Sequence, residues 1–379
     1  MKLSTDRILT THVGSLPRSE AVCDLVFAKE AGRAVDSAAY EKTISEAVAD
    51  VVKRQAGSGV DVVSDGEMSK ISYATYIKDR LTGFEGDSPR RIPADLEAFP
   101  GYAERALRGG GPLYRRPRCT GPIRMKDLAP VRADIANLQA ALGRERVVEG
   151  FMNAASPGVI AMFQPNDHYP THEAYLAALA DAMQAEYEEI HQAGLVLQID
   201  SPDLAVGRHM MFKSDSEDEF LRHAELHVEA LNHALRNVPP SQVRLHVCWG
   251  NYEGPHHCDI DLDRILPIVL KARVQILSFE AANPRHAHEW AVFKEMKLPD
   301  DKVLMPGLID SCTNYVEHPK LVAERICRFA EIVGRERVLA GTDCGFSTFA
   351  GVGRVDPDVV YAKLNSLAEG AAIASDRLW

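Results

Sequence analysis

Short apolar runs alternate with longer amphipathic stretches along most of the chain. The short runs are rich in Val, Ile and Leu, which is typical of buried strands, and the longer stretches repeat their apolar residues at helical spacing. The runs that predict strands are residues 8–14, 60–67 with an acidic loop at its end, 119–124, 146–152, 195–200, 243–248, 274–280, 303–309 and 337–341. The stretches that predict helices are residues 39–56, 171–193, 218–235, 263–272, 286–296, 318–333 and 357–375.

Alternation of strand and helix predicts a parallel sheet. Eight parallel strands close a barrel, so we interpret residues 119–124 as an extra strand that pairs within an insertion. The expected fold is α/β, a (β/α)8 TIM barrel of residues 1–379 in one domain, with the insertion at residues 81–124. A doubly wound open sheet is the alternative, but no G-x-G-x-x-G dinucleotide loop follows the first strand.

The insertion interrupts the regular pattern. It contains the glycine-rich run 109–112 and the basic run 115–118. Such composition is typical of an irregular surface segment, so we interpret it as a loop or mobile flap. We expect its arginines to face solvent; contact with an anionic substrate is the alternative.

Composition narrows the classes of partner. The chain has 379 residues and a net charge of −11, and no extended basic segment. This argues against a nucleic-acid partner and against an anionic membrane surface. No apolar stretch is long enough to span a bilayer and the N-terminus lacks a signal core, so we expect a cytoplasmic protein. The seven cysteines show no disulfide framework and are expected to be thiols or metal ligands.

Residues with metal-binding chemistry stand at the ends of three predicted strands. His246 and Cys248 are two residues apart in one strand, so their side chains project from the same face. Glu280 ends the next strand, and Cys344 follows the last one. Imidazole, thiolate and carboxylate are ligands of Zn²⁺. We therefore predict a zinc site; the alternative is a core histidine and buried cysteines, which are common in apolar interiors.

This ligand set favours one kind of zinc chemistry. Two thiolates and a carboxylate outweigh the charge of the metal, so the site polarises a carbonyl weakly but can hold a substrate thiol as thiolate at neutral pH. Hydrolytic zinc sites rest on histidine-rich or histidine and carboxylate ligands. We expect alkyl transfer to a thiol, with a small-molecule thiol and an alkyl donor as partners; self-association into a homo-oligomer is compatible with the sequence.

Further polar residues stand where the active site of a barrel lies, at the C-terminal ends of strands. Capping of the following helix or turn is the alternative for several of them. These residues are Ser15, Asp65, Glu67, Asp200, Asp310 and Asp343.

Together these residues resemble the C-terminal catalytic barrel of cobalamin-independent methionine synthase. Besides the four expected metal ligands, the resemblance rests on the runs Val-Gly-Ser-Leu-Pro at 13–17, Asp-Gly-Glu at 65–67 and Ile-Asp at 199–200. It implies a (β/α)8 barrel that moves a methyl group from a methylfolate to a thiolate on zinc. By the same resemblance Gly14 and Ser15 hold the carboxylate of a homocysteine-like substrate, and Glu67 and Asp200 hold its ammonium and serve catalysis.

The sequence departs from the synthases at two functional positions. Asp200 is followed by Ser-Pro at 201–202, where the synthases have Glu-Pro. Asp310 is followed by Ser and Cys at 311–312, where the synthases have an Asp-x-His whose histidine acts in proton transfer. We name His256 as the replacement proton donor, with His257 and His286 as other candidates. The short relatives of the family include epoxyalkane:coenzyme M transferase, so thiol addition to an epoxide is an alternative. Transfer from a methylated substrate to a folate and a metal-free decarboxylase on the same barrel are the others.

Overall fold

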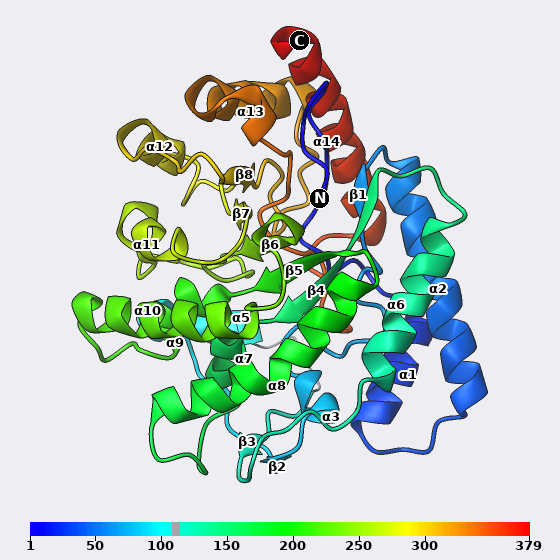
Figure 1. Cartoon of the computed structure of the whole chain (residues 1–379), viewed down its shortest axis with the longest axis vertical. Coiled ribbons are helices and arrows are strands. Elements are labelled where there is room, and N and C mark those ends of the chain that lie inside the picture. Colours follow the sequence, from blue (N-terminus) through cyan, green and yellow to red (C-terminus); the bar gives the residue numbers. More distant parts are fainter. Residues whose placement is uncertain (108–113) are drawn as a thin grey trace.

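Parallel strands form the centre of the molecule, with helices on the outside (Figure 1). The computed structural model describes residues 1–107 and 114–379. Its main sheet has the order β1-β4-β5-β6-β7-β8, and each neighbouring pair is parallel. These strands are β1 (Val62–Val63), β4 (Glu149–Ala155), β5 (Val196–Asp200), β6 (Val243–His246), β7 (Ile276–Phe279) and β8 (Val303–Pro306).

Two extended segments close this sheet into a barrel. Residues 338–341 pair with β8 and, through a parallel bridge between Ala340 and Thr10, with the N-terminal segment. The carbonyl of Thr10 accepts a hydrogen bond of 3.0 Å from the N–H of Val62 at the start of β1. The six strands and these two segments, together called staves below, form a closed ring of eight in the described chain. This confirms the predicted (β/α)8 barrel. The two segments make bridges only, so they are less regular than the strands expected there.

Helices follow the staves in order around the outside of the barrel (Figure 1). In the described residues no helix is long and apolar enough to cross a membrane. The main outer helices are α1 (Glu20–Glu30), α2 (Ser37–Gly57), α6 (Ala129–Leu142), α7 (Pro157–Phe163), α8 (His172–Gln192), α10 (Glu217–Ala234), α11 (Leu262–Val269), α13 (Pro319–Val333) and α14 (Pro357–Leu378). The short elements are α3 (Ile77–Arg80), α9 (Gly207–Met210), α12 (Val292–Glu295), and the 3-10 turns η1 (Pro202–Leu204), η2 (Pro240–Gln242), η3 (Glu289–Ala291) and η4 (Arg335–Arg337).

Side chains alternate between the two faces of each stave, as the period of a strand requires. In β8, Leu304 belongs to the large core between staves and helices, whereas Val303 and Met305 belong to a smaller cluster on the opposite face. That smaller cluster also contains Leu9 and Ile276 from other staves. The barrel interior is therefore packed, and polar groups gather beyond it at the C-terminal ends of the staves.

The insertion contains a hairpin and two short helices. Its strands β2 (Phe84–Glu85) and β3 (Arg118–Cys119) pair antiparallel, so the extra strand pairs within the insertion as predicted, over fewer residues. Between them lie α4 (Ala94–Glu97) and α5 (Pro100–Leu107). The segment is thus more ordered than the loop expected from its composition. The glycine-rich run 109–112 lies outside the described residues.

The sequence pattern missed or overstated several helices. Residues 286–296 form only η3 and the four-residue α12 instead of one helix. The 7-residue α7 was not predicted because all of its residues are buried, which leaves no polar face to give a helical period.

Candidate metal centre and active site

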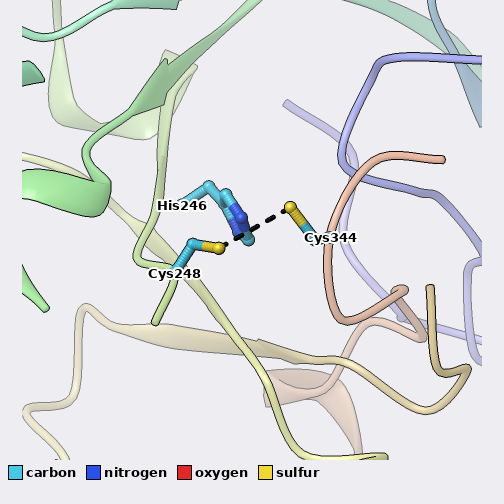
Figure 2. A group of neighbouring side chains, drawn as sticks. All are labelled: His246, Cys248 and Cys344. Atoms are coloured by element: carbon cyan, nitrogen blue, oxygen red, sulfur yellow. Dashed lines mark hydrogen bonds between the residues drawn. The ribbon is translucent and has the colours of Figure 1, made fainter. Parts of the chain in front are cut away.

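Three of the four predicted metal ligands meet above the barrel (Figure 2). One ligand atom from each of His246, Cys248 and Cys344 lies within 4.8 Å of the others, and all three residues are buried. The two sulfurs are 3.7 Å apart. Two thiolates at about 2.3 Å from a tetrahedral zinc lie about 3.8 Å from each other. The spacing of the sulfurs therefore fits this metal.

The hydrogen bonding of His246 suits a metal ligand. Its Nδ1 lies 3.1 Å from the hydroxyl of Ser278 on β7, and its Nε2 is buried without a hydrogen-bond partner in the described residues. A hydrogen bond at one ring nitrogen commonly orients the other toward a metal. Burial, followed by the charge of Arg244, lowers the pKa of His246 to about 3, so the imidazole is neutral, as metal binding requires.

The surroundings of the two cysteines disfavour the thiolate form when no cation is bound. The contact with Cys344, followed by burial, raises the pKa of Cys248 well above its usual value, and the nearby carboxylate of Glu280 adds to this. A bound dication would reverse this effect, because coordination deprotonates a thiol. The donor set and its electrostatics thus both fit zinc.

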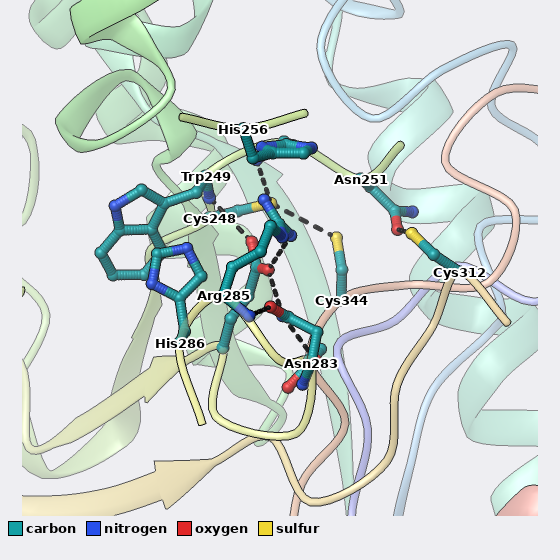
Figure 3. A network of polar contacts seen from close by, with 12 residues as sticks. Cys248, Trp249, Asn251, His256, Asn283, Arg285, His286, Cys312 and Cys344 are labelled. Atoms are coloured by element: carbon teal, nitrogen blue, oxygen red, sulfur yellow. Dashed lines mark hydrogen bonds and ion pairs between the residues drawn. The ribbon is translucent and has the colours of Figure 1, made fainter. Parts of the chain in front are cut away.

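The fourth predicted ligand, Glu280, is not one of the three clustered residues. It belongs to a network of hydrogen bonds with Trp249, Asn283 and Arg285, which Figure 3 labels. Its carboxylate accepts from the N–H of Trp249 at 2.8 Å, from the amide of Asn283 at 2.7 Å and from Arg285 at 2.7 Å. A carboxylate has about four lone-pair sites, so three donors leave room for a metal. Its role as ligand stays a prediction.

Glu67 provides an unpaired carboxylate. It lines the same cavity as the three clustered residues, and this cavity is called the chamber below. Glu67 follows β1 with a φ of 60°, a conformation that non-glycine residues rarely adopt and that recurs at functional sites. Arg18 fixes the backbone by donating to the carbonyl of Glu67 at 2.7 Å. Both carboxylate oxygens are buried and have no hydrogen-bond partner among the described residues. Burial, with repulsion from Asp200 and against the attraction of Lys70, raises the pKa of Glu67 to about 7.

Asp200 is the second acidic residue of the chamber and ends β5. Its two oxygens accept from the amides of Asn153 and Gln198, each at 2.8 Å. Gln198 in turn accepts from the buried Arg244 at 2.7 Å, which links the carboxylate to the polar floor of the barrel. Burial raises the pKa of Asp200 despite these two hydrogen bonds. An ammonium group between Glu67 and Asp200 would remove the cost of burying both charges.

The predicted carboxylate-binding residues divide into one that faces the chamber and one that does not. Ser15 lines the cavity, whereas Gly14 is not part of its wall. The N–H of Gly14 donates to Nδ1 of His12 at 3.1 Å. Its φ is 133°, and a Cβ there would lie 2.2 Å from Oδ1 of Asn153. Glycine is thus required at this position for the close approach of the chain to Asn153.

The predicted proton donor His256 is not part of the cavity wall. Its Nδ1 lies 3.2 Å from Asp259, and its Nε2 lies 2.9 Å from the carbonyl of Tyr252. The ring stacks behind Tyr252, which does line the cavity. A catalytic role of His256 stays a prediction, and the structure gives its ring nitrogens two partners within the protein.

A cavity of about 450 Å³ joins these groups, a size typical of small-molecule sites. Sequence patterns did not identify most of its wall, because no local signal marks these residues as facing a cavity; they come from the insertion, from loops, from β4 and from α7. The residues missed include Tyr73, Tyr114, Asn153, Phe163, Asn251 and Phe349.

The chain is similar to known proteins of one family. The family model described as "Cobalamin-independent synthase, Catalytic domain" matches residues 8–99 and 118–355. The methionine synthase of Sulfolobus acidocaldarius is 23% identical over 97% of this chain and 93% of its own length, and that of Saccharolobus solfataricus is 24% identical over 97% and 95%. A B12-independent methionine synthase from Shewanella, solved in complex with selenomethionine, superposes with a TM-score of 0.73 at 19% identity, over 98% of this chain and 99% of that one.

Proposed function

The chain belongs to the family of the cobalamin-independent synthase catalytic domain, and from this premise we propose that it is a zinc-dependent methyltransferase that acts on a homocysteine-like thiol. Residues 1–379 would act as one catalytic barrel in the cytoplasm, with a methylfolate as the alkyl donor in the first instance. The methionine synthases of the two archaea, which span nearly the same length, support this assignment.

One observation carries the proposal: the His246, Cys248 and Cys344 cluster shares a chamber with the unpaired carboxylate of Glu67. An amino acid that bears a thiol matches both, since the thiol suits the cluster and the ammonium suits the acidic pair. Zinc held by the three residues, with Glu280 as fourth ligand, would keep the substrate thiol as a thiolate at neutral pH.

The residues of the chain then have separate tasks. Glu67 and Asp200 bind the ammonium group and so orient the amino acid with its sulfur toward the cysteines. Ser15 lines the same chamber and offers a hydroxyl to the carboxylate. Arg285 holds Glu280 in place through its 2.7 Å contact. The aromatic wall excludes water from the sulfur, which favours its attack on the methyl group over competing hydrolysis.

Zinc content and turnover together test the proposal. The purified protein should contain about one zinc per chain, by the ligand count of a mononuclear site, and should form methionine from homocysteine and 5-methyltetrahydrofolate. The double variant Cys248→Ser/Cys344→Ser should lose most of the metal and all of the activity. Cys327→Ser, on the outer helix α13, is the matched control and should keep both.

Stoichiometric zinc in the double variant would rule out the metal assignment. If the zinc-loaded protein alkylates homocysteine with an epoxide but not with the methylfolate, the proposed methyl donor is wrong and an epoxide takes its place.

A further inference from the structure

Arginines from the insertion form part of the cavity wall. Arg91 and Arg116 line it, together with Arg90 and with Arg354 from the other side. Arg116 is only 4% exposed, although the sequence predicted a solvated loop. The hairpin explains the difference, because β3 begins two residues later and draws Arg116 inward against the ring of Phe163, 5.2 Å from its centroid.

Both guanidinium groups have hydrogen-bonding capacity that the described protein leaves unused. Nε of Arg116 and one terminal nitrogen of Arg91 are buried and have no hydrogen-bond partner within the part of the chain that the structure describes. Burial, followed by the charge of Arg116, lowers the pKa of Arg91. A buried guanidinium beside a second, half-buried one is unfavourable unless an anion joins them.

The arginines and the clustered residues Cys248 and Cys344 line the same cavity. Aromatic side chains also line it, among them Tyr73. Its ring packs 5.8 Å from that of Phe349, and Phe349 stacks on Tyr114 at 5.1 Å. A ligand that fills the cavity therefore meets both aromatic rings and guanidinium groups.

We propose that Arg91 and Arg116 form an anion subsite for the alkyl donor, which is an elongated molecule with an aromatic or apolar centre and a terminal oxyanion. The proposal rests on the proposed function for the identity of that ligand as donor. Guanidinium groups bind carboxylate, phosphonate and sulfonate through paired, charge-assisted hydrogen bonds. The carboxylates of Glu67 and Asp200, which line the same cavity, repel such a group, so the anion of the donor binds at the arginines.

Small aromatic acids test the subsite directly. The probes are 3-phenylpropionate, its neutral amide, and 2-phenylethylphosphonate and 2-phenylethylsulfonate, titrated by calorimetry into the zinc-loaded full chain. We expect the acid to bind at least about 10-fold more tightly than the amide, as loss of a charge-assisted hydrogen bond implies. The order among the three anions identifies the oxyanion of the natural donor.

Two variants and a matched control test whether Arg116 and Arg91 bind the anion. Arg116→Gln and Arg91→Gln should each weaken binding of the acid by about 10-fold and leave binding of the amide unchanged. Arg115→Gln removes the same charge from the neighbouring position, where the side chain is 60% exposed, and should have little effect. Zinc content and homocysteine binding should stay as in the original protein.

Equal affinity for acid and amide would overturn the subsite, and so would an equal loss in the Arg115→Gln control. Failure of the methyltransferase proposal gives a different result, because a protein without zinc or turnover would still show the difference between acid and amide.

Discussion

At the scale of one residue, Glu67 has a carboxylate whose charge is unfavourable in the protein without a ligand, because both of its oxygens are buried and have no hydrogen-bond partner among the described residues. The sequence indicated an acidic residue beyond a strand, since its position and type are local properties. It could not indicate that both oxygens are buried without a partner, because this depends on residues distant in the sequence, such as Asp200 at the end of β5, whose charge acts on Glu67. The same limit applies to His246, whose orientation depends on Ser278.

The first prediction concerns recognition of the substrate amine. Glu67→Gln should raise the dissociation constant for homocysteine by about 10- to 100-fold, the range of one charge-assisted hydrogen bond. Binding of 4-mercaptobutyrate, which lacks only the amine, should change little. Calorimetry on the zinc-loaded proteins measures both. An equal loss for the two thiols would show that Glu67 does not contact an ammonium group.

The same pair of ligands predicts a pH dependence. Since the pKa of Glu67 is about 7, its carboxylate is protonated below that pH and attracts an ammonium group less. The ratio of homocysteine to 4-mercaptobutyrate affinity should therefore fall as the pH drops from 8 to 6, and the ratio cancels titration of the thiol that both share. In Glu67→Gln the ratio should not vary with pH; a persistent decline would assign the titration to Asp200.

At the scale of elements, the insertion is tied to the loop that follows the metal-binding strand β6. Asp95 on α4 is fully buried and accepts from the hydroxyl of Tyr252 at 2.7 Å and from the N–H of His256 at 3.0 Å. Tyr102 on α5 donates to the carbonyl of Glu253. The insertion therefore covers the cavity and also fixes part of its wall.

The third prediction tests this link. Asp95→Asn replaces a charged group that has two acceptor oxygens with a neutral amide that has only one. The variant should destabilise the protein by about 1–3 kcal/mol. Hydrogen exchange measured by mass spectrometry should rise in residues 250–258, while the zinc content stays at one per chain. Glu97→Gln on the same helix is the control, because Glu97 pairs with Lys213 at the surface, where ion pairs contribute up to about 1 kcal/mol. Unchanged exchange in residues 250–258 would contradict the link.

Elements differ in how well the sequence predicts them. The staves from β4 to β8 were predicted within a few residues because each is a continuous apolar run, whereas the segments 8–14 and 337–341 were expected as full strands and make only bridges. The helices inside the insertion could not be predicted, because they are short and their burial depends on contacts with distant loops. The arginines of the insertion were expected in solvent for the same reason.

At the scale of the molecule, the barrel brings residues from position 15 to position 344 into one chamber. The parallel arrangement requires this, since every stave presents its C-terminal end on the same face. The fold class and the grouping of three candidate metal ligands could therefore be predicted from strand ends alone. The depth of the chamber and its charge distribution could not, because they arise from how loops cover that face.

The last prediction links this arrangement to the stability of the whole chain. The pKa of Glu67 is raised from 4.5 to about 7 on folding, so its ionisation disfavours the folded state. Below pH 4.5 the carboxyl is neutral in both states, and above about pH 7 it is charged in both. Stability should therefore be lost as the pH rises through this window, by about 3 kcal/mol at about 1.4 kcal/mol per pKa unit. Glu67→Gln should match the original protein near pH 4 and exceed it at pH 8 when unfolded by urea without a thiol ligand.

The exposed Glu85 on β2 provides the control, since Glu85→Gln should give no such difference at either pH. Saturating homocysteine should then stabilise the original protein more than Glu67→Gln at pH 8, because only the original protein gains the ammonium contact and ligand binding adds to the free energy of unfolding. If Glu67→Gln were no more stable at pH 8 without ligand, the carboxylate would have to be paired in the free protein. The site would then hold no unfavourable charge for the substrate amine to neutralise.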